Sequence, residues 1–205
     1  MLGRMDRHAP SKRQGRPAPG GERGAGRPDL QEPGSDRPSR EGHAGEPGAD
    51  RAASYREAVA RIGLLLEGET DWVAAMATVA CELHGAFHHF DWTGFYRVVG
   101  DELVVGPYQG THGCLRIAYG RGVCGTAWKE ARTQLVPDVR EFAGHIACSD
   151  STLSEIVVPV LRPDGSVLAI LDVDSDRLAA FDDVDVFALE ALCAELGERF
   201  GAESR

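Results

Sequence analysis

Three stretches of the chain carry apolar residues three or four positions apart, which is the spacing of one face of an α-helix. They run from Tyr55 to Leu66, from Trp72 to Phe87 and from about Asp182 to Phe200. Thr70 is expected to cap the second helix, with Asp71 in its first turn, where a negative charge is favourable. The pattern therefore predicts two helices before the middle of the chain and one at its C-terminal end.

The chain between these helices is rich in β-branched and aliphatic residues. Two runs, 91–99 and 102–106, flank Gly100-Asp101, and two more, 154–161 and 166–173, flank Pro163-Asp164-Gly165. Each pair is typical of a β-hairpin. A short helix near Gly122–Ala131 and a strand at 133–136 are expected between the hairpins, with 107–125 and 137–151 mainly as connections. The sum is an α+β fold, with a central, mostly antiparallel sheet flanked by N-terminal and C-terminal helices.

Composition divides the chain near residue 50. Residues 1–50 hold 10 of the 25 Gly and 7 of the 11 Pro. The same segment holds almost no large apolar residue beyond Leu2 and Leu30. It therefore cannot bury enough apolar surface to offset the entropy lost on ordering. We predict a disordered tail at 1–50 and one domain at 51–205.

Charge and hydropathy limit the classes of binding partner and the cellular compartment that the sequence favours. The domain has 13 basic and 24 acidic residues, a net charge of −11, which disfavours nucleic acids and anionic membranes as partners. The sequence contains no apolar run near the roughly 20 residues that span a bilayer, and no signal peptide. A cytoplasmic location is therefore expected.

The five cysteines fall into two groups, and permanent disulfides are not expected in a reducing compartment. Cys81 and Cys193 lie within predicted helices and are interpreted as packing residues. Cys114, Cys124 and Cys148 lie in Gly-rich or loop segments, where reactive groups are usually placed. These three are the candidates for chemistry.

Local surroundings favour ionisation of two of these thiols. Cys124 stands at a predicted helix start near Arg121, a setting that favours a thiolate, and His145 is close enough in sequence to help Cys148 ionise. Structural zinc sites usually show closely spaced ligand pairs, and the sequence has no C-x-x-C pair, so no metal is predicted. Simple packing of these cysteines stays open as an alternative.

Three carboxylates are expected to meet on the second hairpin. A two-residue turn at Asp164-Gly165 places Glu155 opposite Asp174, and a three-residue turn places it opposite Val173. Asp172 and Asp174 share a face, because strand side chains alternate. Neighbouring like charges are unfavourable unless a cation arrives or one group holds a proton. The cluster is a candidate site for an ammonium group with one carboxylic acid as proton donor, and solvent-facing strand ends are the alternative.

Trp92 and Tyr96 lie four positions apart on the first predicted strand. Side chains alternate along a strand, so the two rings share a face. They either pack in the core or form an apolar wall for a small ligand, such as a methyl or thioether group.

These residues lie within motifs that resemble the GAF-domain free methionine-R-sulfoxide reductases. The motifs are Asp91-Trp92-Thr93-Gly94-Phe95-Tyr96, Gly106-Pro107-Tyr108-Gln109-Gly110, Gly120-Arg121-Gly122-Val123-Cys124-Gly125, Gly144-His145-Ile146-Ala147-Cys148, Ser154-Glu155-Ile156-Val157-Val158-Pro159 and Leu171-Asp172-Val173-Asp174-Ser175. The resemblance covers essentially residues 52–200. A GAF fold alone would say little about function, whereas three cysteines combined with these carboxylates are specific.

The resemblance implies a role for each thiol. Cys148 is the nucleophile, and Cys124 or Cys114 is the resolving thiol. Attack on free methionine-R-sulfoxide converts Cys148 to a sulfenic acid, which becomes an intramolecular disulfide. An external dithiol, thioredoxin in the usual case, then reduces the disulfide. The implied enzyme is an oxidoreductase without cofactor or metal.

The resemblance also implies a substrate site and a possible assembly. Glu155, Asp172 and Asp174 hold the ammonium and polarise or protonate the sulfoxide, and Trp92 and Tyr96 contact the methyl end. Asp138 is expected to line the site as well. GAF domains often pair through terminal helices, which suggests a homodimer. The competing function is a GAF sensor of a small molecule or oxidant, which would show no turnover.

Overall fold

The computed structural model describes residues 48–144 and 151–202. Its helices are α1 (Gly48–Leu65), α2 (Trp72–Ala86), α3 (Gly122–Glu130) and α4 (Asp183–Phe200), with a short 3-10 helix η1 (Val139–Glu141). Its strands are β1 (Trp92–Val99), β2 (Glu102–Gln109), β3 (Arg116–Ala118), β4 (Gln134–Val136), β5 (Ser154–Leu161) and β6 (Val167–Ser175). The expected helices and both hairpins are present, and α1 begins inside the stretch predicted as a tail.

The strands form one antiparallel sheet in the order β3-β2-β1-β6-β5-β4. The second hairpin returns to the first, so β6 lies beside β1, with Trp92 opposite Asp174 and Arg97 opposite Ala169. The predicted α+β class with an antiparallel sheet is confirmed. This topology places the aromatic pair and the acidic residues on adjacent central strands.

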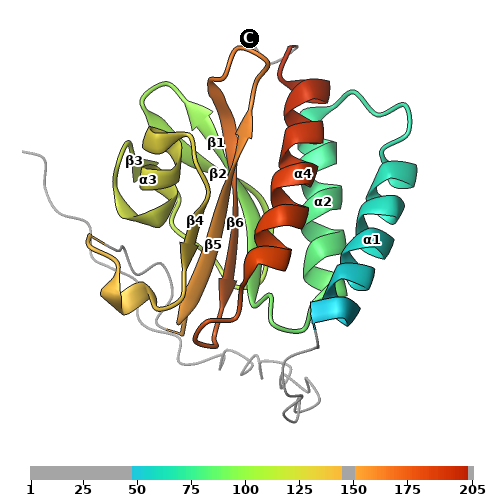
Figure 1. Cartoon of the computed structure of the whole chain (residues 1–205). Coiled ribbons are helices and arrows are strands. Elements are labelled where there is room, and N and C mark those ends of the chain that lie inside the picture. The colour runs from blue at the N-terminus through green and yellow to red at the C-terminus, as the bar shows by residue number, and fades with distance from the viewer. Residues whose placement is uncertain (1–47, 145–150, 203–205) are drawn as a thin grey trace, which may run out of the picture. The chain divides into compact units, whose positions relative to one another are not determined.

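The two faces of the sheet carry different helices. Helices α2 and α4 cover one face, with α1 packed against both of them, while α3 lies against the other face (Figure 1). Strand alternation sends Leu171 and Val173 into the larger core under α1, α2 and α4. Their neighbours Ile170 and Asp172 therefore point to the α3 face, which also holds the aromatic pair and Cys124. Among the described helices, none is long and apolar enough to cross a membrane.

Three local expectations are wrong. Asp71, not Thr70, caps α2, because its carboxylate accepts a hydrogen bond from the Ala74 amide at 2.8 Å. Cys81 is exposed rather than packed, since it lies off the apolar stripe of α2. Part of the Gly-rich connection after β2 forms the short strand β3, which pairs with β2 through Leu103 and Ile117. Cys193 is buried in the core, as predicted.

Candidate active site

The second hairpin brings the three carboxylates together on the α3 face. Glu155 on β5 lies opposite Asp174 on β6, two residues from Asp172. The loop Pro163-Asp164-Gly165 is closed by a hydrogen bond from the residue before it to the residue after it, and Gly165 has φ 82°. The register of the two strands shifts by one residue between Val160 and Leu161, next to this three-residue loop. The shift restores the pairing of Glu155 with Asp174 that a two-residue turn would give. The expected meeting of the carboxylates is confirmed.

Burial raises the pKa of all three carboxyl groups. Glu155 is 6% exposed and Asp172 is 5% exposed. Burial raises the pKa of Asp172 to about 7, although hydrogen bonds from Cys124 and Glu155 oppose the rise. Burial, and then the charges of Asp172 and Asp174, raise the pKa of Glu155 well above its usual value. Burial and Asp172 do the same for Asp174. The alternative of solvent-facing strand ends is therefore wrong.

One oxygen of this cluster has unused hydrogen-bonding capacity. Asp172 Oδ1 is buried and makes no hydrogen bond within the described part of the chain. A buried acceptor without a partner costs about 1–3 kcal/mol. A ligand that brings a cationic donor, such as an ammonium group, would satisfy this oxygen.

Cys124 faces the carboxylates from the first turn of α3. Its Sγ lies 3.8 Å from Glu155 Oε1. Burial, together with the charges of Asp172 and Glu155, raises the pKa of this thiol well above its usual value. The expected thiolate is wrong, because the Arg121 side chain is exposed while the thiol lies among acids. Cys124 is therefore a neutral thiol that can donate to Glu155.

The aromatic pair forms a wall beside the carboxylates. Trp92 lies opposite Asp174 and stacks on Tyr96, with ring centroids 5.8 Å apart and an interplanar angle of 24°. Both residues are buried. Tyr108 of β2 stacks on Trp92 as well, at 5.3 Å and 18°. Sequence reasoning assigned no role to Tyr108, although its pairing with Gly94 across the first hairpin could have indicated one.

Gly94 explains how the indole reaches this position. It lies on β1 between Asp172 of β6 and Tyr108 of β2. A Cβ at Gly94 would lie 2.6 Å from Trp92 Cη2 and would also clash with the Tyr108 Cβ. The missing side chain therefore makes room for the Trp92 ring over the sheet.

Of the other predicted site residues, Asp138 and Cys114 lie within the described ranges and Cys148 does not. Asp138 binds Arg140 through both carboxylate oxygens, at 2.8 and 2.6 Å, and this ion pair lowers its pKa. Cys114, between β2 and β3, is half-buried and disulfide-bonded. Cys81, Cys124 and Cys193 are free thiols. Cys148, the predicted nucleophile, lies outside the described residues.

A metal ion is the other ligand that this donor set could hold. Within the described residues, Cys124, Glu155 and Asp172 offer three ligand atoms that lie within 4.8 Å of one another. Metal ligands must be deprotonated, however. Because burial favours the neutral form of all three groups, a metal would have to displace their protons.

Comparisons with known proteins agree with this fold. The GAF domain model matches residues 68–198. Free methionine-R-sulfoxide reductase of Escherichia coli strain K12 is 41% identical over 132 residues, which are 64% of this chain and 79% of that protein. GAF domain-containing protein A of Dictyostelium discoideum is 48% identical over 132 residues, 64% of this chain and 82% of its own.

A solved structure is similar over a larger share of the chain. Free methionine-R-sulfoxide reductase from Neisseria meningitidis, in complex with its substrate, is 47% identical, with a TM-score of 0.71. The match covers 78% of this chain and 97% of that one.

Fold and site thus define a GAF domain that carries buried carboxyl groups, an aromatic wall and cysteines on one face of its sheet. The chain belongs to the GAF domain family, in the group that includes the free methionine-R-sulfoxide reductases. The resemblance drawn from the sequence motifs is confirmed.

Proposed function

We propose that this protein is an oxidoreductase that reduces free methionine-R-sulfoxide to methionine by thiol chemistry. The observation that carries the proposal is the meeting of two buried carboxyl groups, Glu155 and Asp172, with the half-buried Asp174 beside Trp92 and Tyr96. The carboxylates offer a site for the substrate ammonium, and the rings offer a surface for its methyl group. A peptide-linked residue has no free ammonium, so the free amino acid is the substrate.

The first half of the reaction transfers oxygen between two sulfur atoms. The Cys148 thiolate attacks the sulfoxide sulfur, and a carboxylic acid of the cluster protonates the sulfoxide oxygen. The oxygen moves to Cys148 as a sulfenic acid, so that methionine is reduced and the cysteine is oxidised by two electrons. The raised pKa values of Glu155 and Asp172 support this role, because a proton is available near neutral pH.

Cys114 is the better candidate for the resolving thiol. It is disulfide-bonded and half-buried, whereas Cys124 is a buried free thiol whose pKa is raised. We assign Cys148 as the cysteine that pairs with Cys114, and Cys124 as a hydrogen-bond donor to Glu155. An external dithiol, thioredoxin in this proposal, then reduces the disulfide by exchange, which suits a reducing cytoplasm. The reaction as proposed needs no resident cofactor.

Turnover with separate substrate epimers tests the function. With dithiothreitol as reductant, the wild-type protein should release methionine from the free R epimer and not from the S epimer. Cys148→Ser should release none, while Cys81→Ser, which changes an exposed free thiol, should match the wild type. A folded, fully reduced wild type that turns over neither epimer would favour a GAF sensor of a small molecule or oxidant.

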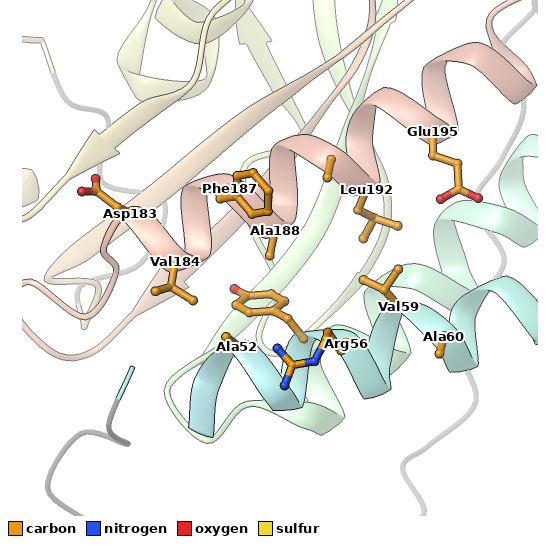
Figure 2. A pocket seen from close by; sticks show the side chains of 12 residues that line it. Ala52, Arg56, Val59, Ala60, Asp183, Val184, Phe187, Ala188, Leu192 and Glu195 are labelled. Atoms are coloured by element: carbon orange, nitrogen blue, oxygen red, sulfur yellow. The ribbon is translucent and has the colours of Figure 1, made fainter. Parts of the chain in front are cut away.

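We further propose a homodimer through the helices α1 and α4. A groove of about 720 Å³ lies between them, lined by small apolar side chains such as Ala52, Val59 and Ala188 (Figure 2). Phe187 borders it and is 78% exposed. Arg56 comes from α1, whereas Asp183 and Glu195 come from α4 (Figure 2). A second copy offers both an aromatic ring to fill the groove and charges of the opposite sign.

A further inference from the structure

The segment that leads to Cys114 is attached to the aromatic wall. The Trp92 indole Nε1 donates a hydrogen bond of 2.9 Å to the backbone carbonyl of Thr111. Gly113 lies so close to both rings that a Cβ there would be 3.0 Å from the Tyr96 hydroxyl and 3.3 Å from Trp92 Cζ2. Both rings are buried, so they cannot turn aside without disturbing close packing. The backbone just before Cys114 therefore follows the position of the indole.

We propose that Trp92 is a positioning residue for the step in which Cys114 resolves the oxidised nucleophile. This role rests on the proposed reductase function. After methionine leaves, the Cys114 sulfur attacks the sulfur of the Cys148 sulfenic acid. The S–O bond breaks, the S–S bond forms, and the hydroxyl group leaves as water with the thiol proton. The hydrogen bond to Thr111 and the contact with Gly113 set the place from which the Cys114 thiol attacks.

Loss of this positioning should change the rate of disulfide formation by a measurable factor. A displacement of about 1 Å between reacting groups can slow a step about a hundredfold. Trp92 is also proposed to contact the methyl end of the substrate. One side chain then serves both halves of the catalytic cycle, substrate binding and disulfide formation.

Gly113→Ala tests this role without changing a residue of the proposed substrate site. Its Cβ would move the Cys114 segment away from the rings. Reduced enzyme is mixed with one equivalent of the R epimer and no reductant. Methionine release should keep the wild-type rate, whereas disulfide formation should be about three- to tenfold slower, because the Cβ forces a shift of a fraction of an ångström. Sulfenic acid trapped by dimedone should accumulate. Gly85→Ala in α2, where a Cβ meets nothing within 4 Å, is the matched control and should leave both rates unchanged.

A double-mutant cycle connects the effect to the indole. Trp92→Phe removes the N–H group, so Gly113→Ala should slow disulfide formation less in that background than in the wild type. Additive effects, or disulfide formation at the wild-type rate in Gly113→Ala, overturn the role of Trp92. If Gly113→Ala does not fold, Trp92→Phe alone tests the role. The amount of sulfenic acid trapped per methionine released should then exceed the wild-type ratio, and an unchanged ratio overturns the role of Trp92. Absence of methionine release from folded wild type instead overturns the reductase function.

Discussion

The residues that recognise the substrate in our proposal also oppose folding. An ionised carboxylate loses hydration when it is buried, and Asp172 keeps an oxygen without a hydrogen bond inside the described chain. Its pKa of about 7 lies far above the ordinary value near 3.8. The folded state therefore binds more protons than the unfolded state between about pH 4 and 7, and stability decreases as pH rises through that window.

Asp172→Asn should consequently stabilise the protein while it abolishes turnover. The amide has similar size and no charge to desolvate, so the free energy of unfolding should rise at pH 8 by up to a few kcal/mol and change little at pH 4. Urea unfolding at the two pH values measures the difference. Asp101→Asn, in the exposed turn between β1 and β2, is the control and should leave the pH dependence as in the wild type. Equal or lower stability of Asp172→Asn at pH 8 would contradict the electrostatic cost.

At the scale of elements, the position of α4 depends on close contact with β5. Gly197 lies in the helix where a Cβ would clash with the backbone carbonyl of Leu161. Helix α4 also begins with a capping box, in which Asp182 and Asp185 satisfy each other's backbone amides. The helix thus has a defined start and a fixed distance from the hairpin that carries Glu155.

We expect opposite effects from two glycine substitutions in helices. Gly197→Ala should destabilise the protein by roughly 1–3 kcal/mol, because α4 must move away from β5. Gly63→Ala in α1, where a Cβ meets nothing within 4 Å, should stabilise it by up to about 1 kcal/mol through helix propensity. Thermal unfolding of both variants compares them directly. A stabilised Gly197→Ala would show that the helix can shift at little cost.

The extent to which sequence predicts this site depends on the range of the interaction. Glu155 and Asp174 could be paired from strand alternation and one loop, because both operate over a few residues. The ionisation of Cys124 could not be predicted, since its burial depends on how α3 packs on distant strands. The same holds for the hydrogen bond from Trp92 to Thr111, which joins residues nineteen positions apart.

On the scale of the whole molecule, we predict that catalysis needs only the domain. The pairing of β6 with β1 completes the proposed substrate site within residues 48–202, apart from the thiol of Cys148. Deletion of residues 1–47 should therefore leave kcat/KM for the free R epimer within about twofold of the full chain. A larger loss would assign the N-terminal segment a part in activity and contradict this prediction.

The proposed dimer is tested by changing the exposed ring beside the groove. Phe187→Asp places a charge against an apolar surface and should convert dimer to monomer in light scattering at micromolar concentration. Leu115→Asp, on a side chain of similar exposure on the connection before β3, should keep the mass of the wild type. A wild-type monomer, or an unchanged mass for Phe187→Asp, would contradict this interface.

The absence of a side chain at Gly94 decides what can lie over this part of the sheet. The indole occupies the space that a side chain at this central position would need. A side chain at this position would displace the Trp92 ring, and with it the wall beside Asp172. Gly94 is the third of the eight residues of β1, so the requirement for glycine falls inside a strand and not in a turn. We expect GAF domains with a larger residue at this position to bind their ligands without a ring laid over the sheet.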